Sequence, residues 1–259
     1  MADFALLLAA AAGSLVGFSL ALVGGGGSIL AVPLLVYAVG MKDPHMAIGT
    51  SAVGVAANAA LGLFGKARAG AVKWRCGAVF AATGVIGAIV GSHLGQRVDG
   101  QALLSLFAML MLVVAVMMLR RGEATGDVAV VLGRDNAGKL ILFGLGTGLL
   151  SGFFGIGGGF LIVPGLIAAT AMPIYNAMAT SLFAVTAFGL TTASSYAVAG
   201  LVDWAVAAAF ITGGFAGSLL GARYADRLRQ KRGALTRLFA GLIFAVAAYM
   251  LWQAGSAIL

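Results

Sequence analysis

The sequence has 259 residues, of which 61% are hydrophobic and only 9% are charged, and its mean hydropathy is +1.06. A soluble domain carries about 25% charged residues, so this composition excludes a soluble protein and indicates an integral membrane protein. The net charge of +8 does not indicate nucleic-acid binding, because basic residues in the loops of a membrane protein report its orientation.

Ten apolar segments follow one another along the chain. Spanning a bilayer takes roughly 20 residues, within a range of about 17–25, and eight segments reach that length. The second and seventh have only about 13 residues, or roughly 20 Å of helix, and each follows a glycine cluster. We therefore predict that these two are half-helices buried among the others, since exposed irregular backbone is costly in hydrocarbon. The predicted segments are about 3–23, 28–40, 46–65, 76–96, 101–119, 139–155, 159–171, 177–199, 204–222 and 234–254.

The chain also repeats itself at an offset of about 130 residues. Residues 22–33 (LVGGGGSILAVP) align without a gap with residues 153–164 (FFGIGGGFLIVP). Further along, residues 70–74 (GAVKW) match residues 200–204 (GLVDW). Five segments per half is an odd number, so the second half is predicted to lie inverted relative to the first.

Basic residues fall almost entirely on one side of the predicted membrane. With the N-terminus outside, 14 of the 16 Lys and Arg residues lie in inner connections, and only Lys42 and Arg97 lie outside. Because connections rich in Lys and Arg stay in the cytoplasm, both termini are predicted to be extracytoplasmic. The sequence thus predicts an all-α, polytopic membrane protein with a first repeat, a cytoplasmic connection and a second, inverted repeat, at residues 1–119, 120–138 and 139–259.

The two glycine clusters are the strongest candidates for a binding site. A helix that begins beside them, at Ser28 or Phe160, presents unpaired N–H groups and the positive end of its dipole, which binds anions. Glycine-broken segments at corresponding places in two halves are also typical of a transporter's binding site. The alternative role is close helix packing through small residues. The candidates here are Gly25, Gly26, Gly27, Ser28, Gly157, Gly158 and Gly159.

Hydroxyl and amide groups near the starts of the third and eighth segments are further candidates. Thr50 and Ser51 occupy positions equivalent to Thr180 and Ser181, and Asn58 lies two turns beyond Ser51. Such groups can donate hydrogen bonds to an oxyanion while they remain neutral. The alternative is hydrogen bonding between helices or to carbonyls of the same helix.

Acidic residues and catalytic patterns are missing from the predicted membrane interior. All eight acids lie at segment ends or in connections, whereas a cation site or a carboxylate proton relay needs one at mid-membrane. An anion is therefore the expected ligand, and no metal, cofactor or enzymatic activity is expected. His45 and His93 lie near segment ends, where a protonation-linked role stays open, and the single Cys76 excludes an intramolecular disulfide.

With these motifs the chain resembles the TauE/SafE family of sulfite exporters and anion permeases. Residues 24–33 with Gly49-Thr50-Ser51 and Asn58 carry the match in the first half, and residues 155–164 with 179–181 carry it in the second. The resemblance implies a secondary transporter of small anions, such as sulfite or organosulfonates, in the bacterial inner membrane. Ala179 replaces Gly49 and Phe188 replaces Asn58 in the second copy, so the site is predicted to be asymmetric.

Two other functions remain open from the sequence. An anion channel would lack alternating access, and a membrane accessory or scaffold subunit would use its glycines for packing only. The expected partners are a small anion and the lipid bilayer, without nucleic acid. A coupling proton or other ion, the direction of transport and the oligomeric state do not follow from the residues.

Overall fold

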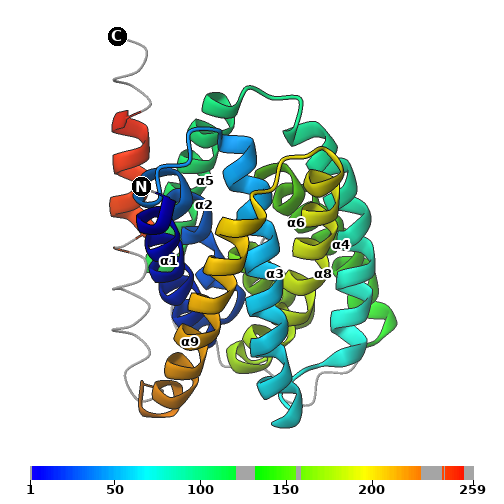
Figure 1. The fold of residues 1–259 in the computed structure, drawn as a ribbon. Coiled ribbons are helices and arrows are strands. Elements are labelled where there is room, and N and C mark those ends of the chain that lie inside the picture. Colours follow the sequence, from blue (N-terminus) through cyan, green and yellow to red (C-terminus); the bar gives the residue numbers. More distant parts are fainter. Residues whose placement is uncertain (1, 121–131, 156–158, 229–240, 242, 254–259) are drawn as a thin grey trace.

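The computed structural model describes residues 2–120, 132–155, 159–228, 241 and 243–253, and these form helices joined by short connections (Figure 1). The last described helix covers residues 243–253. The elements before it are α1 (Ala2–Val23), the 3₁₀ turn η1 (Gly24–Leu30), α2 (Ala31–Pro33), the π-helical η2 (Leu34–Ala38), α3 (Pro44–Arg68), α4 (Trp74–Gly95), α5 (Gly100–Arg120), α6 (Arg134–Phe154), α7 (Gly159–Thr170), α8 (Ile174–Val198) and α9 (Trp204–Leu228).

The predicted fold class is confirmed as an all-helical, polytopic membrane protein in the part of the chain that the structure describes. Six of its helices are long and apolar enough to span a bilayer, namely α1, α3, α4, α6, α8 and α9. Two of the eight spans expected, 101–119 and 234–254, extend into residues that are not fully described. The two short segments are short in the structure as well, at residues 24–38 and in α7.

Three acids predicted at segment ends prove to be N-caps. The carboxylate of Asp43 accepts hydrogen bonds from the backbone N–H groups of His45 and Met46 at the start of α3. Asp99 and Asp203 do the same at the starts of α5 and α9. Each acid satisfies N–H groups that a helix leaves unpaired, which explains why these three acids stand at helix ends and not inside the bundle.

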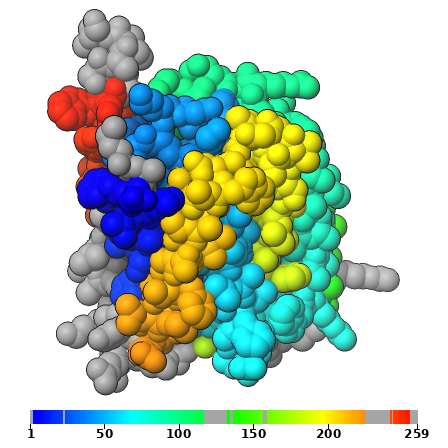
Figure 2. All heavy atoms as spheres, viewed as in Figure 1, coloured from blue at the N-terminus to red at the C-terminus, as the bar shows by residue number. Residues whose placement is uncertain are grey.

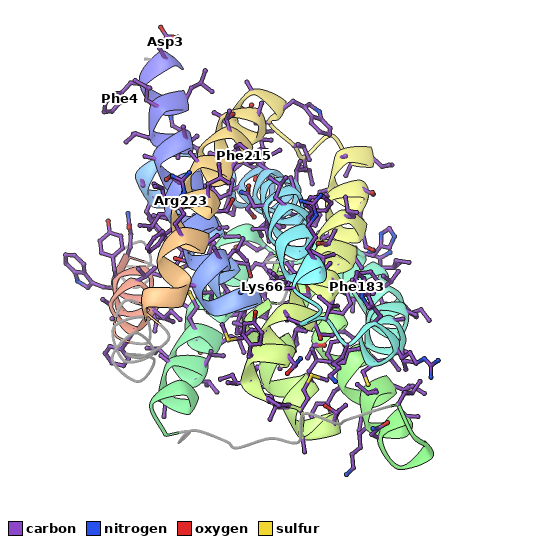
Figure 3. The ribbon with its side chains drawn as sticks, turned by 90° about the horizontal axis from the view of Figure 1, so that it is seen from below. Asp3, Phe4, Lys66, Phe183, Phe215 and Arg223 are labelled. Atoms are coloured by element: carbon purple, nitrogen blue, oxygen red, sulfur yellow. The ribbon has the colours of Figure 1, made fainter. Side chains whose placement is uncertain are left out.

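Large apolar side chains lie exposed around the outside of the bundle. Leu142 is 70% exposed on α6, and Phe4, on α1, is 67% exposed and lies at the edge of the bundle (Figure 3). A soluble protein would bury such groups. The exposed apolar surface therefore fits a bilayer as the surrounding solvent.

Two helix pairs pack through glycine. α1 lies against α9 and α4 lies against α6; α1 and α9 are side by side on the face drawn in Figure 2. A Cβ added at Gly17 would clash with the backbone of Gly214, and one at Gly148 would clash with the backbone of Gly84. Gly17 is equivalent to Gly148 in the repeat, and Gly214 is equivalent to Gly84. The two halves therefore use equivalent positions to bring helices together.

Left-handed backbone recurs at the same offset. Every residue with a positive φ in the described part of the chain has an equivalent in the other half, and five of these six residues are glycine. The exception, Ala171, has a φ of 54°, a conformation that costs an L-residue roughly 1–2 kcal/mol. The equivalent pairs are Gly24 with Gly155, Gly40 with Ala171, and Gly70 with Gly200.

Candidate functional site

The two glycine-broken segments meet inside the molecule. A Cβ added at Gly159 would clash with the carbonyl group of Gly25, and one at Gly25 would clash with the backbone of Gly159. Gly25, Gly26, Gly27 and Ser28 are all buried, as is Gly159. Only glycine permits this approach of two backbones. The candidates Gly157 and Gly158 lie outside the described residues.

The first half-helix begins earlier than the sequence indicates. Its helical hydrogen bonding starts at Gly24, in η1, and not at Ser28. The glycines form this 3₁₀ turn themselves, since they have no side chain to collide with the neighbouring backbone. The hydroxyl of Ser28 donates a 2.9 Å hydrogen bond to the carbonyl oxygen of Gly25 within the turn. The second half-helix, α7, begins at Gly159, next to the expected Phe160.

Ser181 connects α8 to the first glycine cluster. Its hydroxyl oxygen accepts a 3.2 Å hydrogen bond from the N–H of Gly25, and its hydroxyl donates a 2.8 Å bond to the carbonyl of Met178. The equivalent Ser51 on α3 donates a 2.8 Å bond to the carbonyl of Ile48. Both serines are fully buried. The structure therefore brings Ser181, Gly25 and Gly159 together at one place.

Thr50 and Thr180 have different partners from the adjacent serines. The hydroxyl oxygen of Thr50 accepts a 3.0 Å hydrogen bond from the N–H of Asp203, just before α9. That of Thr180 accepts a 2.9 Å bond from the N–H of Lys73, just before α4. Each threonine thus binds the connection that precedes a helix of the other half. These contacts are reciprocal, and they give both hydroxyls a structural partner.

Asn58 is the least satisfied polar side chain among the candidates. It is 1% exposed, and neither its amide nitrogen nor its amide oxygen has a hydrogen-bond partner among the described residues. The amide lies against Gly214 on α9. Phe188, at the equivalent position of α8, lies against Gly84 on α4. Because buried amides are nearly always hydrogen-bonded, Asn58 is a position where water or a ligand is expected to bind.

Sequence reasoning missed Ser151. It lies in the last turn of α6, four residues before Gly155, and is fully buried with an unpaired hydroxyl. A serine in an apolar helix carries no sign of whether it faces the bundle or lipid, so only the packing identifies it. Among the described residues, no group of three or more His, Cys, Asp or Glu side chains could hold a metal ion.

The family model for the sulfite exporter TauE/SafE matches residues 9–250. The chain belongs to the TauE/SafE family. The predicted family and the prediction of a membrane transporter, not an enzyme, are thereby confirmed.

Curated relatives of this TauE/SafE protein carry transporter names. A "Probable membrane transporter protein" of Xylella fastidiosa strain 9a5c is 50% identical over 252 residues, covering 96% of this chain and 95% of the relative. The "Probable membrane transporter protein YunE" of Bacillus subtilis is 25% identical over 246 residues, covering 87% and 88%. No solved structure matches the chain significantly.

Proposed function

We propose that this TauE/SafE protein is a secondary transporter of small anions, with sulfite and organosulfonates as the substrate class, in the bacterial inner membrane. The observation that carries the proposal is the meeting of the two glycine-broken segments at Gly25 and Gly159, beside the buried hydroxyl of Ser181. Backbone N–H groups and a hydroxyl at a helix start can hold an oxyanion without a buried cation. A midplane site between two repeats is the arrangement that alternating access needs.

The two repeats are proposed to be inverted relative to each other. The reciprocal bonds of Thr50 to Asp203 and of Thr180 to Lys73 support a two-fold relation between the halves, because each joins one half to the equivalent connection of the other. The positions of two equivalent connections support the inverted arrangement, because they lie at opposite ends of the bundle. The connection between α3 and α4 is at the bottom of Figure 1, and that between α8 and α9 is at the top. Rocking of the repeats about the central contact would expose the site to each side in turn.

Substrate contacts are proposed for a central group of residues and not for all candidates equally. Gly25, Ser28, Ser51, Ser181 and Asn58 would contact the anion, with Gly26, Gly27, Gly157, Gly158 and Gly159 shaping the backbone around it. Asn58 would supply a hydrogen-bond donor that has no protein partner among the described residues. Thr50 and Thr180 are proposed to hold the connections before α9 and α4, and so to position the adjacent serines.

Substitution of Ser181 tests the site against a matched control on the same helix. Ser194 also lies on α8, and its exposed hydroxyl donates to the carbonyl of Leu190. In proteoliposomes loaded with sulfite, Ser181→Ala is expected to lower the rate of labelled sulfite exchange by about tenfold, the factor that corresponds to about 1.4 kcal/mol. Ser194→Ala should leave exchange unchanged. Equal exchange rates for both variants, in folded protein, would show that Ser181 is not part of the binding site.

A further inference from the structure

The two ends of the α3–α8 pair are each closed by a contact that involves an aromatic ring. At one end the rings of His45 and Tyr196 lie with their centroids 6.5 Å apart and their planes tilted by 32°. At the other, Nζ of Lys66 lies 5.0 Å from the ring centroid of Tyr175. Each contact joins the first turn of one helix to the last turns of the other. The two helices therefore run antiparallel, with one such contact at each end.

These contacts occupy equivalent positions in the repeat. His45 corresponds to Tyr175, and Lys66 corresponds to Tyr196, at the same offset of 130 that relates Thr50 to Thr180. Lys66 lies at the end of α3 that faces the viewer in Figure 3. Ser51 and Ser181 lie between the two contacts along α3 and α8. An anion path that followed this helix pair from Ser51 and Ser181 would pass one ring contact toward each side of the membrane.

The chemistry of each contact suits an element that opens and closes. Tyr196 is fully buried, yet its hydroxyl and Nδ1 of His45 have no hydrogen-bond partner among the described residues. No hydrogen bond between these two atoms has to be broken when the rings separate, and the separation would admit water to both atoms. At the other end Lys66 and Tyr175 are half-buried, and their cation–π contact is readily exchanged for water. Lys66 there also places a positive charge where an anion would enter or leave.

We propose that His45–Tyr196 and Lys66–Tyr175 are the outer and inner gates of the anion path. This assignment rests on the proposed function, and it adds the residues that control access to the site from each side. The outer gate, with Tyr196 buried, is the more tightly closed of the two in this structure. The inner gate combines closure with electrostatic attraction for the substrate.

Thiol accessibility tests the gates without any knowledge of the substrate. The full-length protein, with Cys76→Ala and Ser181→Cys, is reconstituted in one orientation and treated with a membrane-impermeant maleimide from either side. Tyr196→Ala is expected to raise labelling at position 181 several-fold from the outer side only. Tyr175→Ala is expected to raise it from the inner side only. Each substitution removes the ring that closes one end, and so shifts the population toward a state open on that side.

Two control variants separate gating from loss of packing. Phe183→Ala removes a ring of α8 that contacts Trp74, with 5.5 Å between centroids, and that takes part in neither gate contact, so it should leave labelling unchanged from both sides. Tyr196→Phe keeps the ring and should also leave outer labelling low. Unchanged labelling in both tyrosine-to-alanine variants, or an increase from both sides in either one, would contradict the assignment of these contacts as gates. Absence of sulfur-anion transport by the wild-type protein would instead count against the proposed function.

Discussion

Hydrogen-bond partners distinguish the polar residues of the site from one another. Ser28, Ser51 and Ser181 each donate to a carbonyl three residues earlier, so each hydroxyl already has a protein partner. The amide of Asn58 is buried without a protein partner among the described residues, and an amide left unsatisfied there would cost about 1–3 kcal/mol. That cost favours a ligand or a water molecule as the partner of the amide.

Replacement of Asn58 is expected to separate stability from function. Asn58→Leu removes two buried polar atoms that have no protein partner among the described residues, so it should raise the free energy of unfolding by about 1 kcal/mol while it abolishes anion exchange. Asn176 provides the control, because its amide donates a 2.9 Å bond to the carbonyl of Ala71. Asn176→Leu should lower stability. Thermal unfolding in detergent and exchange in proteoliposomes measure both effects; full exchange activity in Asn58→Leu would exclude Asn58 from the path.

Ala171 offers a test of backbone strain at a repeated turn. Ala171, with a φ of 54°, occupies the position equivalent to Gly40, which has a φ of 84°, so Ala171→Gly should stabilise the protein by about 1 kcal/mol. Ala199→Gly, at a position with a φ of −76°, should bring no gain. The melting temperatures of the two variants decide the matter. A loss of stability in Ala171→Gly would show that the turn is not strained.

At the scale of the helices, hydropathy located the spans well and the glycine clusters located the breaks. Helices α3, α4 and α8 begin within three residues of the predicted segments 46–65, 76–96 and 177–199. Hydropathy measures only transfer to lipid, so it could not reveal that Gly24–Leu30 form a 3₁₀ turn. Nor could it separate Thr50 from Ser51, since the partner of Thr50 lies 153 residues away in sequence.

Glycines on α6 provide a matched pair for helix packing. Gly148 faces the backbone of Gly84 on α4, whereas a Cβ at Gly146 would meet nothing within 4 Å. Gly148→Ala should therefore destabilise the protein by about 1–3 kcal/mol through overpacking. Gly146→Ala should be neutral or mildly stabilising, within about 1 kcal/mol. Thermal unfolding of the two variants measures the difference, and equal melting temperatures would contradict the α4–α6 contact.

For the molecule as a whole, the repeats and the membrane orientation are linked. The charge distribution predicts that the α3–α4 connection is cytoplasmic, and the inverted arrangement then requires the equivalent α8–α9 connection to be extracytoplasmic. Ala69 and Ala199 are exposed, equivalent residues of these two connections. They therefore report on orientation and on inversion together.

Labelling of these two positions gives opposite results if the repeats are inverted. In a Cys76→Ala background and in intact cells, Ala199→Cys should react with an impermeant maleimide, and Ala69→Cys should react only after the membrane is permeabilised. The reverse result would still show that the repeats are inverted, but it would show that the predicted membrane orientation is wrong. Labelling of both positions from one side would show that the repeats are parallel.

Sulfite exchange by the wild-type protein tests the central claim most directly. Proteoliposomes are loaded with labelled sulfite, and efflux is followed with and without unlabelled sulfite outside. A carrier that alternates access returns faster when it is loaded, so external sulfite should accelerate efflux, and the effect should saturate. No flux of sulfite or of any organosulfonate, or a flux that is indifferent to external anion and does not saturate, would contradict transport by this mechanism.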